Sequence, residues 1–152
     1  GIQDVGRRLV WSHLLRSPET LRAWALQAKP GIGRTIKLHC GPALARVAKL
    51  GNKASDENVR ADIAALPGLL DTIDAMIDAD TIGGPVPNAA DFQVFSTVGL
   101  WSNLVDLREP IMKRPCGPAA ARLFPDYDGR IPGGLLPAEW FSPLHSDPLP
   151  LI

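Results

Sequence analysis

Few side chains in this sequence could perform chemistry on their own, and they are widely spaced. The three histidines are His13, His39 and His145, and none lies in an HExxH or similar ligand pattern. Because zinc ligands recur at characteristic spacings, we interpret each histidine as a surface or packing residue rather than as a metal ligand. The sequence therefore predicts no metal site and no self-contained catalytic group.

Two cysteines, Cys40 and Cys116, are the remaining candidates for nucleophilic chemistry. They stand far apart and show no CxxC or zinc spacing, so neither a disulfide framework nor a metal site is indicated. Cys116 is the better candidate for a reactive thiol, because Pro115 and Gly117-Pro118 predict an exposed loop around it. The alternative for both is a structural or incidental cysteine. This usage favours a reducing, cytoplasmic location.

The most informative pattern is the hexapeptide at residues 87–92, Pro-Asn-Ala-Ala-Asp-Phe. Asn88 is a preferred N-cap, because its side-chain oxygen can accept a backbone N–H of the first helical turn. Asp91 follows three residues later, where its carboxylate can accept the N–H of Asn88 and complete a capping box. The role of this pair is structural: it predicts where a helix begins.

The helix that follows is expected to cover residues 88–106 and to be buried. From residue 89 to 105, Asp91 is the only charged residue, and apolar residues recur on every face. A helix of this type is either a membrane span or the centre of a bundle. Polar residues interrupt the run before it reaches the roughly 18 apolar residues of a membrane span, so we predict a central bundle helix and no transmembrane segment.

The other elements are predicted to be helical too, and no strand pattern is present. Ser17-Pro18-Glu19 predicts one helix start, and Ser55-Asp56-Glu57 predicts another, whose amphipathic helix Pro67 should kink. Between them, residues 32–50 predict an apolar and basic segment that is broken at Gly41-Pro42.

Length and composition fit one compact domain over residues 1–152, because 45% of the chain is hydrophobic and the formal net charge is zero. The helical patterns make the predicted fold an all-α bundle. From residue 125 onward the chain is Pro-rich. We predict that this tail is an ordered coil that wraps the bundle through Leu135, Leu136, Trp140 and Phe141.

Charge is unevenly distributed along the chain. Residues 20–55 carry seven basic side chains and no acid, whereas residues 56–80 carry seven acids against Arg60. We interpret the two segments as solvated helix faces that pair within the domain or across a dimer. The alternative is a basic amphipathic segment that binds an anionic membrane or partner. The zero net charge gives no indication of nucleic-acid binding.

An all-helical domain whose buried central helix follows a Gly-Gly turn and opens with a Pro-(Ser/Thr/Asn)-x-Ala-Asp box resembles the C-terminal domain of the cytosolic glutathione transferases. The family usually has Ser or Thr at the cap, and Asn88 is an equally good capping residue. The resemblance extends over most of the chain: Arg7-Arg8 and Trp11 fit the first long helix, residues 55–79 the second, 88–106 the core helix, and 107–141 the short terminal helices and tail.

In this family, glutathione binds mainly to a separate N-terminal thioredoxin-like domain, which also supplies the Tyr, Ser or Cys that activates the thiol. The resemblance therefore implies a helical domain with a truncated first helix, no catalytic residue in this chain, and the thioredoxin-like domain as its missing partner. Glutathione would be the co-substrate of the parent protein, a cytoplasmic detoxification enzyme that conjugates it to an electrophile.

By the same resemblance, the helical domain supplies an apolar wall for the electrophile. The candidate substrate-binding residues are Arg7, Trp11, Leu14, Leu15, Trp140 and Phe141. Ordinary core packing is the alternative for the apolar ones, and a surface or dimer salt bridge is the alternative to a glutathione carboxylate for Arg7 and Arg8. The alternative function is a noncatalytic interaction module, as in some translation-machinery proteins, and a homodimer is possible.

Overall fold

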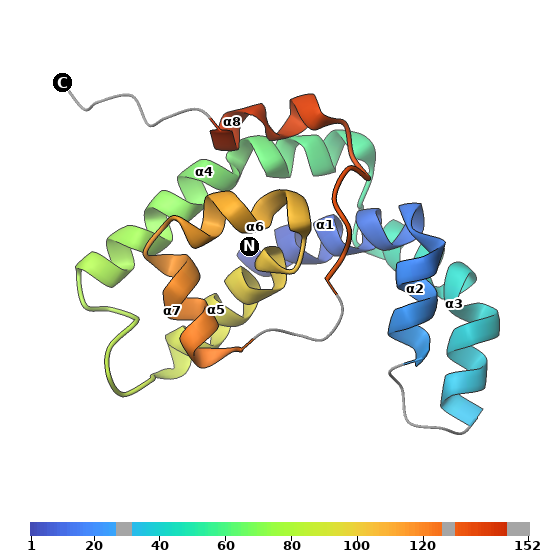
Figure 1. Cartoon of the computed structure of the whole chain (residues 1–152), viewed down its shortest axis with the longest axis horizontal. Helices are drawn as coiled ribbons and strands as arrows, with labels where there is room; N and C mark the ends of the chain where they lie inside the picture. Colours follow the sequence, from blue (N-terminus) through green and yellow to red (C-terminus); the bar gives the residue numbers. More distant parts are fainter. Residues whose placement is uncertain (27–31, 126–129, 146–152) are drawn as a thin grey trace.

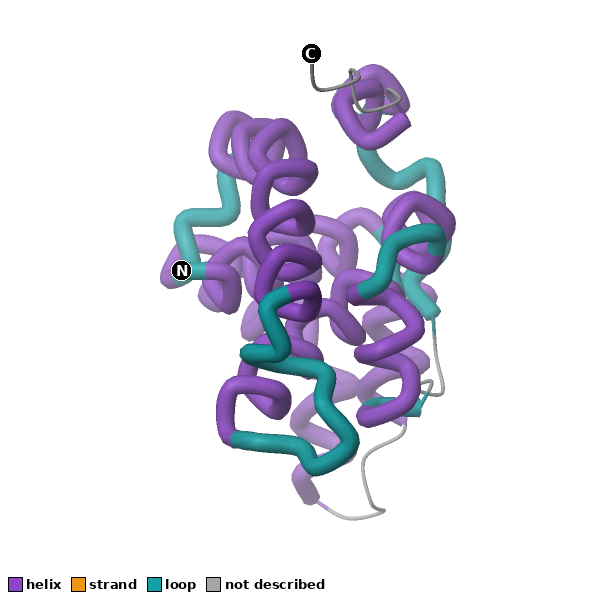
Figure 2. Tube along the Cα trace, turned by 90° about the vertical axis from the view of Figure 1, so that its left-hand side faces the viewer, coloured by secondary structure: helices purple, strands orange, loops and turns teal. Residues whose placement is uncertain are grey.

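The computed structural model describes residues 1–26, 32–125 and 130–145, with all of their side chains except those of residues 24–25 and 32–38. Within these residues the regular elements are helical, as the sequence predicts (Figures 1 and 2). They are α1 (Ile2–Arg16), α2 (Pro18–Leu26), α3 (Ile32–Gly51), α4 (Asp56–Asp78), α5 (Ala89–Ser102), α6 (Val105–Met112), α7 (Cys116–Leu123), the 3-10 helix η1 (Ala138–Phe141) and α8 (Ser142–His145).

Helix α5 lies at the centre of the bundle and packs against α1, α6 and α7. Its side chains Phe95, Val98 and Trp101 are almost completely removed from solvent. The predicted burial of the central helix is therefore confirmed for its later turns. The first turn is more open, since Phe92 is 52% exposed and makes an edge-to-face contact with Phe124.

The central helix is shorter than predicted, because it ends at Ser102 and not at residue 106. Leu104 has an extended backbone and forms an isolated parallel bridge with Ile131. The Val105 N–H donates to the Ile131 carbonyl at 3.1 Å, and the Ile131 N–H donates to the Asn103 carbonyl at 2.9 Å. These bonds satisfy backbone groups outside the helix and separate α5 from α6.

The predicted break at Gly41-Pro42 is wrong, because α3 continues through Pro42. A proline inside a helix removes one backbone hydrogen bond and costs about 3 kcal/mol. Here α3 packs on α1 and α2 through the buried Ala45, and the Cβ position of Gly41 lies 4.0 Å from Leu21. This packing offsets the local cost. Helix α4 also continues through Pro67, and the predicted kink there stays a prediction.

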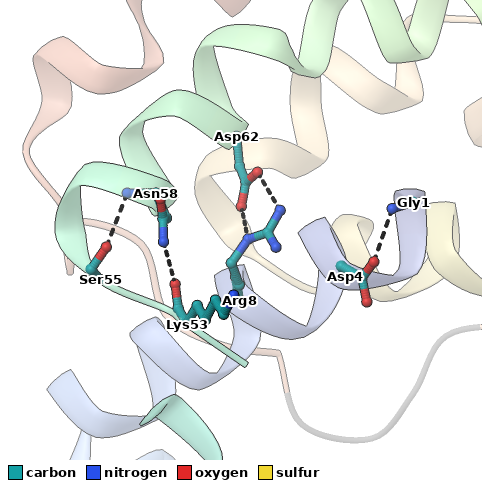
Figure 3. A network of polar contacts seen from close by, with 7 residues as sticks. All are labelled: Gly1, Asp4, Arg8, Lys53, Ser55, Asn58 and Asp62. Carbon is teal, nitrogen blue, oxygen red and sulfur yellow. Dashed lines mark hydrogen bonds and ion pairs between the residues drawn. The ribbon is translucent and has the colours of Figure 1, made fainter. Parts of the chain in front are cut away.

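Ion pairs attach α4 to its neighbours. Asp62 accepts two hydrogen bonds from the Arg8 guanidinium of α1, at 2.6 and 2.7 Å (Figure 3). Asp56 pairs with Arg16 at 2.7 Å and with Lys49 at 3.7 Å. Arg114 pairs with Asp71 and Asp74. Among the described residues, the acids of segment 56–80 that form ion pairs thus do so mainly with arginines outside segment 20–55, and the predicted pairing of the two segments is seen only between Asp56 and Lys49.

The C-terminal tail covers α4, as Figure 1 shows for η1 and α8. Leu136 and Phe141 are buried, and Leu135 and Trp140 pack against the core, so the predicted wrapping coil is confirmed and carries two short helices. Its last prolines, Pro148 and Pro150, lie outside the described residues. Within the described part of the chain, no helix has the length and apolar character needed to span a membrane.

Candidate functional site

The predicted capping box is present at the start of α5. The Asn88 Oδ1 accepts hydrogen bonds from the N–H groups of Ala90 at 2.8 Å and Asp91 at 3.2 Å. In return, the Asp91 Oδ2 accepts the Asn88 N–H at 2.7 Å. Three donors that a helix start would leave unpaired are thereby satisfied.

The box also holds the connection that precedes it. The second carboxylate oxygen of Asp91 accepts the Gly83 N–H at 2.5 Å, and the Asn88 side-chain amide donates to the Thr81 carbonyl at 3.0 Å. Gly83 has a φ of +82°, which favours glycine, and its carbonyl accepts from Arg122 of α7 at 2.9 Å. The α4–α5 connection, the start of α5 and helix α7 therefore meet at one group of residues. We name this group the capping junction; it consists of Thr81, Gly83, Asn88, Asp91 and Arg122.

Asp91 is buried, with 2% of its surface exposed. Backbone hydrogen bonds from Asn88 and Gly83 lower the pKa of its carboxyl, and the positive charge of Arg122 acts in the same direction. The carboxylate is therefore held in its charged, accepting form, and it serves the fold rather than a proton-transfer reaction.

A cavity of about 140 Å³ lies between α6 and the C-terminal tail. The Asp106 carboxylate at its edge accepts the Gly134 N–H at 3.1 and 3.0 Å, which ties the tail to α6. The lining combines apolar side chains with one carboxylate and one imidazole. It consists of Asp106, Gly134, Leu136, Ala138, Phe141 and His145.

Of the six predicted substrate-binding residues, Phe141 lines this cavity. Trp140 lies beside it in η1 and is half-buried. Leu14 is buried in the core, and Trp11 and Leu15 pack against the core from α1. Their positions are consistent with the packing alternative, and their role as substrate-binding residues stays a prediction.

The two arginines of α1 are engaged within the chain to different degrees. Arg7 is exposed and lies 3.8 Å from Asp4, one turn earlier in the same helix. Arg8 is partly buried in its two-bond contact with Asp62, which is consistent with the salt-bridge alternative.

His13 is a buried histidine of α1. The negative charge of Asp106 acts to raise the pKa of its ring, but burial has the larger effect. Its Nδ1 donates to the Leu9 carbonyl at 2.7 Å, and its Nε2 has no hydrogen-bond partner among the described residues. Burial lowers the pKa of His13, so the ring is neutral at neutral pH. Its interpretation as a packing residue is confirmed, and His39 and His145 lie at the surface.

The predicted exposure of Cys116 is wrong. Cys116 is the first residue of α7 and has no exposed surface, whereas Cys40 is exposed. The Cys116 N–H donates to Asp74 of α4 at 3.0 Å, and Arg114 donates to the other oxygen of the same carboxylate at 2.7 Å. These two hydrogen bonds hold Arg114 and Cys116 against α4, where the sequence predicted an exposed loop around Cys116.

Two of the residues that line the cavity, Asp106 and His145, carry no recognisable signal in the sequence. They are far apart in the chain, and only the fold of the tail brings them to one cavity. Among the described residues, no group of three or more His, Cys, Asp or Glu side chains is placed to hold a metal ion.

Comparison of the chain with protein-family models, with curated proteins and with solved structures found no match.

Proposed function

We propose that this chain is the helical, electrophile-side domain of a glutathione-transferase-like protein. The capping junction is the observation that carries the proposal. Together with its neighbouring elements, it gives an Asn88–Asp91 box, a buried central helix after the box, and a Gly83-Gly84 turn that connects the box to the long helix α4. These are the features in which the sequence resembles the family.

The cavity beside Phe141 supports an electrophile-binding role. Its volume of about 140 Å³ is close to the roughly 150 Å³ of an apolar cavity that binds benzene. Leu136, Ala138 and Phe141 offer apolar contacts, while Asp106 and His145 lie at the polar side. The cavity therefore suits one aromatic ring that carries a polar substituent.

In the proposed reaction, a thioredoxin-like domain binds glutathione and lowers the pKa of its thiol. The thiolate attacks the electrophilic carbon, so that a C–S bond forms and the leaving group departs with its bonding electrons. The thiol proton passes to solvent. The present chain contributes by holding the electrophile in position for attack.

The decisive test uses the complete gene product that contains these 152 residues. We expect it to bind immobilised glutathione and to conjugate glutathione to 1-chloro-2,4-dinitrobenzene with release of chloride. Absence of both glutathione binding and conjugation would overturn the proposal. A stable protein partner recovered by pulldown from such an inactive protein would favour the noncatalytic interaction module.

A second test uses the chain alone and 1,3-dinitrobenzene, a ring that lacks the leaving group. We expect this ring to bind the cavity and Ala138→Leu to weaken the binding, because the larger side chain occupies the space beside Phe141. Ala64→Leu, at an exposed position of α4, is the matched control and should leave binding unchanged. Equal binding by both variants would exclude this cavity as the ring site.

A further inference from the structure

An apolar strip runs along the exposed face of α3. It consists of Leu44, Val47 and Leu50, with exposed fractions of 52%, 67% and 78%, together with the exposed Cys40. At about 100° per residue these positions share one side of the helix, while the buried Gly41 and Ala45 lie on the other, where α3 packs on α1 and α2. No described residue covers the strip, which is the largest group of exposed apolar side chains on one helix in the described part of the chain.

The same part of the molecule is strongly basic. Residues 20–55 carry seven basic side chains and no acid, so the remainder of this neutral chain carries a net charge of −7. In the described structure, Lys49 is paired with Asp56, while Arg22, Arg46 and Lys53 are exposed and make no side-chain ion pair. Lys29 and the side chains of Arg34 and Lys37 lie outside the described part of the structure.

The α2–α3 hairpin stands at one end of the molecule, joined to the rest mainly through α1 (Figure 1). Helix α4 runs away from the hairpin and ends at Asp78 on the opposite side. Most of the acidic helix α4 therefore lies away from the basic hairpin, and Asp56 at its start pairs with Lys49 of α3. A negatively charged surface would attract the basic hairpin and repel the acidic helix, which orients the molecule with α3 towards that surface.

We infer that the exposed face of α3 between residues 40 and 50 is a peripheral binding site for anionic lipid membranes, with its apolar strip inserted among the headgroups. A basic amphipathic helix binds a bilayer by burying its apolar face about 5–10 Å deep while its basic residues contact anionic lipids. The strip has only three large apolar side chains, and an anionic lipid surface complements the basic charge of residues 20–55. A lipid surface needs no complementary shape.

The inference is independent of the proposed transferase function and is tested with the whole chain. We expect co-sedimentation with vesicles of phosphatidylcholine and phosphatidylserine, little binding to vesicles of phosphatidylcholine alone, and weaker binding as salt is raised. An environment-sensitive fluorophore on Cys40 should shift to shorter wavelength upon binding, because Cys40 lies on the strip and Cys116 is buried. Inorganic phosphate should not reproduce this shift.

Paired variants separate the apolar and electrostatic contributions. Val47→Ser with Leu50→Ser should weaken vesicle binding on the order of tenfold, and Arg46→Glu by about as much. The matched controls are Val86→Ser, at a residue 80% exposed in the α4–α5 connection, and Arg60→Glu, at an exposed position of α4. Both controls should bind as the parent does, and circular dichroism should show the same helix content throughout.

Three results would overturn the inference. The first is no binding to phosphatidylserine vesicles at low salt. The second is an equal loss of binding in Arg46→Glu and Arg60→Glu, since that would reflect net charge alone. The third is self-association that the strip variants abolish while vesicle binding persists, because the strip would then be an interface between copies of this chain.

Discussion

Cys40 and Cys116 should react very differently with thiol reagents. Burial, with Asp74 nearby, raises the pKa of Cys116 to about 12, so its thiol stays protonated in neutral and mildly alkaline solution. We expect Ellman's reagent to modify only Cys40 in the native protein and both thiols in guanidinium chloride. Cys40→Ser should therefore abolish the native reaction, whereas rapid native labelling of that variant would contradict the burial of Cys116.

His13 should make stability depend on pH in the weakly acidic range. Its pKa is lowered in the folded state, so the unfolded chain binds a proton that the folded chain excludes. The free energy of unfolding should decrease as pH falls below the unfolded pKa of about 6.5. Urea titrations between about pH 7 and pH 5 should show a shallower decrease for His13→Leu than for the parent. Equal decreases would exclude His13 as the cause.

At the level of elements, the capping junction should be a major determinant of where α5 begins. Asn88→Ala should cost about 1 kcal/mol, because the N–H groups of Ala90 and Asp91 lose their acceptor. Asn88→Ser retains an acceptor and should recover most of that loss. Asp91→Ala should also lower the thermal midpoint, since it removes acceptors from Asn88 and Gly83. Unchanged midpoints in both alanine variants would contradict the role of the junction.

The close packing of α7 against the end of α6 depends on Gly117, the second residue of α7. A Cβ atom there would collide with the backbone of Ile111 and Met112, which has no flexible side chain to yield. Gly117→Ala should therefore destabilise the protein by about 1–3 kcal/mol in urea unfolding. Gly68→Ala is the matched control: it lies in α4 with open space around it and should stabilise by about 0.5–1 kcal/mol. An unchanged free energy of unfolding in Gly117→Ala would show that α6 and α7 can move apart without cost.

The sequence predicts those features of the helices whose interacting residues are a few positions apart. It does not predict the features that depend on contacts between distant segments. The Asn88–Asp91 box is readable because its partners are three residues apart, and Ser55 is readable as the cap of α4 for the same reason. The end of α5 depends on Ile131, and the burial of Cys116 depends on Asp74, each far away in the chain. The cavity combines α6 with the tail, so among the predicted substrate residues only Phe141 coincides with it.

At the scale of the whole molecule, the core is divided unequally between the bundle and the hairpin. Helix α5 contributes Phe95, Val98 and Trp101 to the core and is enclosed by α1, α6 and α7. Between residues 39 and 51 of α3, only Gly41 and Ala45 are buried. Regions with few buried apolar contacts open at a lower free energy than the core.

Hydrogen exchange should therefore reveal two levels of stability. Amides in the middle of α5 should exchange last, at the free energy of global unfolding, while those of α3 should exchange earlier through local opening of the hairpin. Leu21→Ala should accelerate exchange in α3 more than in α5, because Leu21 is buried in the hairpin beside Gly41. If α3 and α5 exchanged together in both proteins, the hairpin would belong to the same cooperative unit as the bundle. Earlier exchange of α3 would show that the hairpin can reorganise while the bundle and its cavity stay folded, as insertion of the apolar strip into a bilayer surface requires.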